Sequence, residues 1–127
     1  IVSINTPLNE QTKGMVNADF LNMMKKGSYL INLSRGPIIQ NKELILKNLL
    51  SNNLEGYGTD VWTEEPPLKN DKFYIALKKN ISSLKGRVIV NPHTSYYSKE
   101  ALYECRSKAC LTCLNLIKDR KVNTRIL

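Results

Sequence analysis

The sequence has no apolar run long enough to cross a membrane, and it has few of the residues that crosslink secreted proteins or hold metals. A membrane-spanning helix needs roughly 18 apolar residues in a row, and no segment of the 127 residues approaches that length. There are three cysteines and one histidine. An odd number of cysteines argues against a disulfide framework, so we expect Cys105, Cys110 and Cys113 to be buried or half-buried thiols in a reducing compartment. No second cysteine pair or nearby histidine completes a zinc site, and we predict no metal.

Acidic residues are scarce relative to basic ones. Nineteen Lys and Arg residues against eleven Asp and Glu residues give a formal net charge of +8. Such an excess can attract nucleic acid or another polyanion. The basic residues are dispersed, however, and few aromatic residues lie between them to stack on bases. We therefore predict solvated helix faces, and a polyanion-binding module, testable by its salt dependence, stays the weaker alternative.

Apolar residues make up 42% of the chain, which is enough to fill one hydrophobic core at this length. Short apolar segments alternate with segments of helical pattern. We predict strands at residues 1–5, 28–33, 57–61 and 87–90, and helices at residues 17–26, 41–50 and 98–120. This alternation is typical of parallel strands joined by right-handed crossovers. The sequence therefore predicts an α/β fold, a Rossmann-like parallel sheet with helices on both faces.

Each predicted helix has an apolar side that we expect to be buried. These sides comprise Phe20, Leu21, Met23 and Met24 in the first helix, Leu44, Ile45 and Leu49 in the second, and Leu102, Cys105, Ala109, Leu116 and Ile117 in the third. Asn17 is expected to cap the first helix, and Gly27 is expected to end it.

Polar residues follow each predicted strand. Ligands of parallel α/β sheets bind at the carboxyl ends of strands, which here are the loops at residues 6–7, 34–36, 60–67 and 93–96. Arg35 can offer a planar, two-pronged donor to a carboxylate. Asp60 and Glu65 supply carboxylates, and His93 is the only histidine. An arginine, an acid and a histidine at one sheet edge indicate a proton-transfer and anion-binding site.

Each of these residues also has an ordinary structural explanation. An arginine after a strand is often a surface residue or part of a structural ion pair. A lone histidine is often a loop residue, and acids often cap helices. Only their combination, in this order, indicates function.

Five segments together resemble the D-isomer-specific 2-hydroxyacid dehydrogenases. They are Thr6-Pro7-Leu8, residues 12–16 (TKGMV), residues 26–37 (KGSYLINLSRGP), residues 58–61 (GTDV) with Glu65-Pro66, and residues 91–94 (NPHT). They occur in the family's order over nearly the whole chain, and the spacing between Glu65 and His93 also fits.

The resemblance implies an NAD(H)-dependent oxidoreductase that interconverts a 2-hydroxy acid and a 2-keto acid by hydride transfer. Arg35 would bind the substrate, His93 would act as general acid and base, and Glu65 would orient His93. Asp60 would bind the carboxamide of the nicotinamide. The cofactor-binding residues would be Thr6, Pro7, Leu33, Ser34, Arg35, Asp60, His93 and Ser95. The choice between NAD and NADP stays open, because the residue that reads the ribose lies upstream in this family.

One feature of the family is missing from the sequence. No G-x-G-x-x-G turn opens a helix. Gly56-Tyr57-Gly58 has Val61 in place of the third glycine, and this segment ends a strand instead of opening a helix. In the family this turn comes earlier in the chain. We therefore expect a fragment, with residues 1–97 forming the C-terminal portion of the NAD-binding domain. Residues 98–127 would form a helix and tail that return toward the substrate domain, and the isolated fragment would be inactive.

The residues after His93 resemble one branch of the family. Thr94-Ser95-Tyr96-Tyr97 is similar to the C-terminal-binding-protein corepressors, which bind NAD(H). Tyr96 would then line the substrate pocket with Arg35 and His93, unless it only packs against the last helix. The alternative function is an NAD(H)-sensing interaction module with a vestigial dehydrogenase site. The resemblance implies a homodimer in the cytoplasm, or in the nucleus for a corepressor, with neither a membrane nor nucleic acid as partner.

Overall fold

The computed structural model describes residues 1–118, and these fall into two compact units. The first unit runs from Ile1 to His93 and the second begins at Thr94, whereas the sequence places the boundary after residue 97. The strands are β1 (Val2–Ile4), β2 (Ser28–Asn32), β3 (Leu54–Thr59) and β4 (Val88–Val90). The helices are α1 (Ala18–Met23), α2 (Lys42–Leu50), α3 (Lys72–Lys78) and α4 (Lys99–Ile117), with short 3₁₀ segments η1 (Gly36–Ile38) and η2 (Ser82–Leu84).

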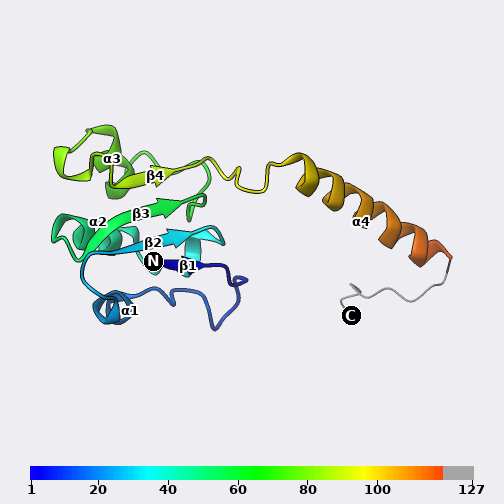
Figure 1. Cartoon of the computed structure of the whole chain (residues 1–127), viewed down its shortest axis with the longest axis horizontal. Helices are drawn as coiled ribbons and strands as arrows, with labels where there is room; N and C mark the ends of the chain where they lie inside the picture. Colours follow the sequence, from blue (N-terminus) through cyan, green and yellow to red (C-terminus); the bar gives the residue numbers. More distant parts are fainter. Residues whose placement is uncertain (119–127) are drawn as a thin grey trace. The chain divides into compact units, whose positions relative to one another are not determined.

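The described strands form one parallel sheet in the order β1-β2-β3-β4 (Figure 1). Leu30 of β2 pairs with Tyr57 of β3, which in turn pairs with Val88 of β4. Because all the strands run the same way, their carboxyl ends meet at one edge of the sheet. The predicted α/β class and parallel sheet are confirmed.

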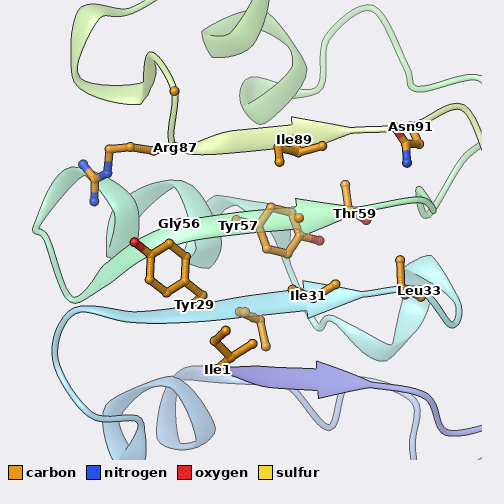
Figure 2. A pocket seen from close by; sticks show the side chains of 13 residues that line it. Ile1, Tyr29, Ile31, Leu33, Gly56, Tyr57, Thr59, Arg87, Ile89 and Asn91 are labelled. Carbon is orange, nitrogen blue, oxygen red and sulfur yellow. The ribbon is translucent and has the colours of Figure 1, made fainter.

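One face of this sheet is hollowed and lined by side chains from β2, β3 and β4 (Figure 2). Tyr29, Leu33 and Ile89 point into this hollow and are 45% to 69% exposed. The sequence predicts helices on both faces. Within the first unit, however, the helices whose side chains enter the core cover the opposite face.

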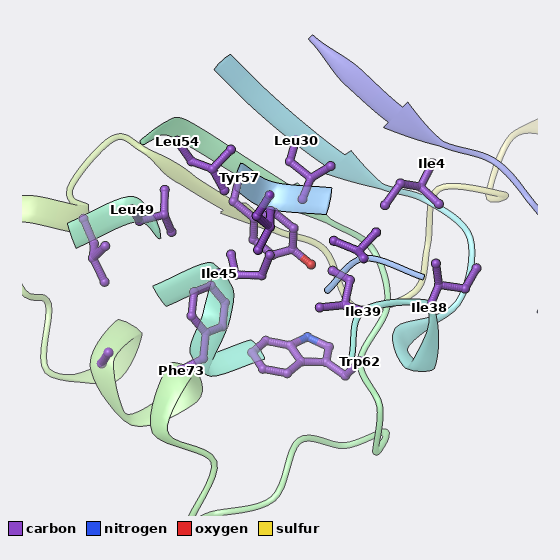
Figure 3. Packing of buried hydrophobic residues seen from close by; sticks show 14 residues of the cluster. Ile4, Leu30, Ile38, Ile39, Ile45, Leu49, Leu54, Tyr57, Trp62 and Phe73 are labelled. Carbon is purple, nitrogen blue, oxygen red and sulfur yellow. The ribbon is translucent and has the colours of Figure 1, made fainter. Parts of the chain in front are cut away.

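The hydrophobic core lies between that opposite face and the helices (Figure 3). Tyr57 of β3 meets the ring of Phe73 edge-on, with ring centroids 5.8 Å apart. Ile45 and Leu49 of α2 are fully buried, as the sequence predicts. Burial of these side chains fixes α2 and α3 against the sheet, and with them the loops that precede both helices.

Several predicted elements differ from the observed ones. Asn17 caps α1 by accepting a hydrogen bond from the backbone N–H of Phe20 at 2.9 Å, as predicted. The helix ends at Met23, before Gly27, and Met23 is 80% exposed rather than buried. The third strand begins earlier than predicted, at Leu54, because the two glycines in it hide its β character. Helix α3 was not predicted, since only Phe73 and Ala76 of its seven residues are buried.

Helix α4 lies in the second compact unit. None of its residues is buried, so the predicted buried stripe is wrong. Its three cysteines are exposed, so the prediction of buried or half-buried thiols is also wrong. An apolar stripe indicates a face suited to packing, but burial also needs a surface to pack against. The predicted end of this helix at Arg120 lies outside the described residues, and within residues 1–118 no helix combines the length and apolarity of a membrane span.

Candidate active site

The loops that follow β3 and β4 meet through two side chains. Oε2 of Glu65 lies 2.6 Å from Nδ1 of His93, although 28 residues separate them in the chain. The two side chains are 38% and 40% exposed. The pair is therefore formed within the protein and is still partly exposed.

The carboxylate of Glu65 is held from a second direction. The backbone N–H of Trp62 donates to Oε1 of Glu65 at 2.9 Å. Desolvation is the largest single influence and raises the pKa of Glu65, but the hydrogen bonds from His93 and Trp62 and the charges of His93 and Lys42 outweigh it. The net effect lowers the pKa of Glu65, so this side chain is an anion at neutral pH.

His93 has an unusual backbone conformation. Its φ angle is +56°, in the left-handed region that side chains other than glycine rarely adopt. The β3–β4 ladder continues up to this turn, since the N–H of Asn91 donates to the carbonyl oxygen of Thr59 at 2.9 Å. Residues held in such conformations cluster at functional sites. The backbone of His93 is thus consistent with a site that fixes the direction of its ring.

A buried asparagine organises the loop that follows β2. The side chain of Asn32 is fully buried, and its Nδ2 donates to the carbonyl oxygen of Arg35 at 3.0 Å. Its Oδ1 accepts a hydrogen bond from the N–H of Ser34 at 3.0 Å. The hydroxyl of Ser34 donates to the carbonyl oxygen of Thr6, which ties this loop to the loop after β1. The sequence did not identify Asn32 as part of the site.

The two loops joined in this way border an open hollow. It is lined by Asn5, Thr6, Pro7, Leu8, Leu33, Ser34 and Arg35. Within the described residues, the buried hydroxyl of Thr6 has no hydrogen-bond partner. Such a group favours a ligand that brings a polar atom to it. This hollow gathers the residues predicted at the ends of β1 and β2.

A second hollow lies at the same sheet edge, around the Glu65–His93 pair. Its lining includes Trp62, Pro66 and Tyr74 beside that pair. Arg35 lines the hollow formed by the loops after β1 and β2, and His93 lines the hollow around the Glu65–His93 pair. The structure thus places all three predicted catalytic residues at one edge and brings Glu65 and His93 into contact.

The loops that carry Arg35 and Glu65 are packed against each other through Gly36. A Cβ on Gly36 would stand 2.0 Å from the carbonyl oxygen of Trp62. The residue after Arg35 therefore touches the residue whose N–H holds Glu65. Trp62 is the only tryptophan of the sequence and comes three residues after the end of β3, and the sequence did not reveal its role in this contact.

The other predicted residues lie in two places. Asp60 is 3% exposed at the end of β3, and its N–H donates to the carbonyl oxygen of Asn32 at 3.1 Å. Ser95 and Tyr96 belong to the second unit, so their roles in the site stay predictions. Tyr96 is 59% exposed and its ring stands edge-on to that of Tyr97. Among residues 1–118, no group of three or more His, Cys, Asp or Glu side chains gathers as metal ligands.

The chain is similar to one group of known proteins. A family model described as D-isomer specific 2-hydroxyacid dehydrogenase, NAD binding domain, matches residues 1–95. A putative 2-hydroxyacid dehydrogenase of Haemophilus influenzae is 37% identical over 102 residues, which are 80% of this chain and 30% of the relative. A D-specific alpha-keto acid dehydrogenase of Enterococcus faecium is 32% identical over 91% of this chain and 37% of the relative. The chain thus spans about a third of the length of these relatives.

Solved structures have the same fold. D-lactate dehydrogenase from Aquifex aeolicus, complexed with NAD and lactic acid, matches with a TM-score of 0.75 and 25% identity over 92% of this chain and 37% of that one. A D-isomer specific 2-hydroxyacid dehydrogenase from Lactobacillus delbrueckii ssp. bulgaricus, in its NAD complexed form, matches with a TM-score of 0.80 and 24% identity. That match covers 98% of this chain and 39% of the other.

Proposed function

The chain belongs to the D-isomer specific 2-hydroxyacid dehydrogenase family, in its NAD-binding domain, and on this premise we propose that the whole protein interconverts a 2-keto acid and a 2-hydroxy acid with NAD(H). The observation that carries the proposal is the 2.6 Å contact between Glu65 and His93 at the carboxyl edge of the sheet. A carboxylate bound to one ring nitrogen of a histidine directs the other nitrogen toward a ligand.

The hollow at the ends of β1 and β2 fits a polar cofactor. Thr6, Pro7, Leu33 and Ser34 line it, and the buried hydroxyl of Thr6 offers an unused donor and acceptor within the described residues. These residues, together with Asp60, would hold NAD(H), which supplies the hydride when bound. NADP(H) remains the alternative cofactor.

The protein's own residues would bind the substrate and move the proton. Arg35 would hold the carboxylate of the keto acid through its planar guanidinium. His93 would donate a proton from Nε2 to the keto oxygen in the reduction and accept it in the reverse reaction. Glu65, held by the N–H of Trp62, would fix the ring of His93 in the direction that this transfer requires.

A His93→Gln variant of the intact protein tests this assignment. We expect turnover of 2-keto acids to fall roughly 100- to 10,000-fold, because that is the usual contribution of a placed proton donor, while the affinity for NADH changes little. The matched control is Lys72→Met, which alters an exposed residue paired with Glu43. Normal turnover of a panel of 2-keto acids by His93→Gln would refute the proposal.

Turnover of the 2-keto acid panel by the unsubstituted protein, measured in the same assay, separates the dehydrogenase from a corepressor-like module. The run Thr94-Ser95-Tyr96-Tyr97 supports the second candidate, in which Tyr96 would line a pocket for bulkier apolar keto acids. A corepressor would bind NAD(H) and turn over no 2-keto acid at any substrate size. Both candidates predict a homodimer of the intact protein, which sedimentation measures.

We also propose that the 127-residue chain binds NADH weakly by itself. Its residues include no G-x-G-x-x-G turn at a helix start to receive the pyrophosphate. Titration of NADH into this chain, followed by fluorescence, measures the affinity. Binding at micromolar concentration would contradict the proposal.

A further inference from the structure

A lysine is buried beneath the loop that carries Glu65. Lys42 opens helix α2 and is only 6% exposed, which is rare for lysine. Its Nζ donates to the carbonyl oxygen of Val61 at 3.2 Å and lies 3.4 Å from the centroid of the Trp62 ring. The ammonium group is therefore held by a carbonyl oxygen and an aromatic face, both from the segment that follows β3.

The carbonyl that Lys42 binds belongs to the peptide bond between Val61 and Trp62. The N–H of that same peptide bond donates to Oε1 of Glu65 at 2.9 Å. The hydroxyl of Thr59 adds a second donor to the Val61 carbonyl at 2.8 Å. Lys42 is thus connected to the carboxylate of Glu65 through one peptide group.

We propose that Lys42 is a positioning residue for the Glu65–His93 pair, acting through the peptide bond between Val61 and Trp62. The role rests on the proposed function, in which that pair handles the substrate's proton. A charged donor on the carbonyl polarises the peptide and makes its N–H a stronger donor to Glu65. The cation over the indole also holds the Trp62 ring, which packs against Phe73 and Tyr74.

The charges around Lys42 agree with this role. Burial, the largest influence, lowers the pKa of Lys42 to about 8, against the opposing charges of Asp71 and Glu65. Asp71 is the N-cap residue of α3, and Glu65 lies in the loop after β3. Lys42 therefore stays mainly charged at neutral pH. Its charge is in turn one of the influences that lower the pKa of Glu65.

A purely structural lysine would have a different signature. If Lys42 only supported the start of α2, its replacement would change stability and would affect the titration of Glu65 through the lost charge alone, so Lys42→Gln and Lys42→Met would shift it equally. A residue that acts on Glu65 through the peptide must shift that titration, because both the lost N–H polarisation and the lost charge favour the protonated acid.

The experiment measures the titration of Glu65 directly, in the intact protein. The ¹³C signals of the glutamate side-chain carboxyls are followed against pH, and the Glu65 signal is assigned by its loss in Glu65→Gln. In Lys42→Met we expect the pKa of Glu65 to rise, with its acid dissociation constant falling about threefold or more. Lys72→Met removes the same charge from an exposed side chain paired with Glu43 and should leave the Glu65 titration unchanged.

Two further variants keep the test decisive. Lys42→Arg retains the charge and the hydrogen-bond donors, so the pKa of Glu65 should stay as it is in the unsubstituted protein. If Lys42→Met does not fold, Lys42→Gln keeps a donor without the charge and should give a smaller shift in the same direction. An unchanged titration of Glu65 in a folded, uncharged variant overturns the inference. The readout needs no turnover, so it tests the effect of Lys42 on Glu65 even where the proposed dehydrogenase activity is refuted.

Discussion

Gly36 and Trp62 lie in backbone-to-backbone contact at the carboxyl edge of the sheet. A Cβ at Gly36 would stand 2.0 Å from the Trp62 carbonyl oxygen and 2.4 Å from the backbone nitrogen of Thr63. Both groups are main-chain atoms, which cannot turn aside as a flexible side chain can. The loop after β2 and the loop after β3 can therefore meet only because residue 36 is glycine.

Replacing Gly36 with alanine should force these two loops apart. We expect Gly36→Ala to lower the free energy of unfolding by about 1–3 kcal/mol or more, as overpacking does in other cores. Urea denaturation measures this loss. The matched control is Gly58→Ala, whose Cβ would meet the Ile31 side chain at an ordinary 3.7 Å. Equal losses in the two variants would mean that the close approach at Gly36 has no special energetic weight.

Removing the side-chain amide of Asn32 should loosen the loop that carries Arg35. Asn32→Ala leaves the N–H of Ser34 and the carbonyl oxygen of Arg35 without their present partner. Unsatisfied buried polar groups destabilise by about 1–3 kcal/mol, so we expect a loss of that size in urea denaturation. Asn22→Ala, at an exposed position of α1, is the control and should change stability by a few tenths of a kcal/mol. Similar losses at both positions would argue that the Asn32 amide does not hold this loop.

The sequence located the edge of the sheet at which the candidate site lies, and the reasons are physical. The carboxyl ends of parallel strands necessarily meet, so residues that directly follow strands can be placed without coordinates. This is why Arg35 and His93 were expected at one edge. The apolar spacing of α2 was equally readable, since Ile45 and Leu49 recur at helical intervals and are both buried.

The contacts between loops could not be predicted in the same way. Lys42 and Trp62 lie outside the segments that resemble the family, and Gly36 lies inside one of them. The contacts of all three arise only when the chain folds and brings α2 beneath the loop after β3. Lys42 is a charged residue at a helix start, for which solvent exposure is the reasonable expectation. Its burial follows from the flat face of Trp62 and the carbonyl oxygen of Val61, which are tertiary features.

Arg35→Lys should weaken substrate binding in the intact protein. A lysine keeps the charge but loses the planar fork that grips a carboxylate through two hydrogen bonds. We expect the KM for the 2-keto acid to rise about tenfold, the effect of losing one charge-assisted bond, with a smaller change in the KM for NADH. Steady-state kinetics measure both constants.

The control for this substitution is Arg87→Lys. Arg87 lies at the amino end of β4, where its Nε donates to the carbonyl oxygen of Glu55 at 2.8 Å. That position is at the opposite end of the strand from His93, so this variant should lower stability without raising the KM for the keto acid. A rise in KM with Arg87→Lys equal to that with Arg35→Lys would mean that Arg35 has no specific place in substrate binding.

Stability should rise with pH in the alkaline range because of Lys42. The folded protein holds the proton on this amine with a pKa of about 8, against 10.5 for an unburied lysine. Between these two values the unfolded chain binds the proton and the folded chain does not, so raising the pH favours the folded state. Below about 8 both states are protonated, and above about 10.5 neither is.

Lys42→Met should therefore abolish this part of the rise in stability with pH. Urea midpoints at several pH values across the window, compared with those of Lys72→Met, isolate the effect, because each variant removes one amine from the unfolded chain. Parallel pH dependence in the two variants would show that the Lys42 amine keeps an ordinary proton affinity in the folded protein.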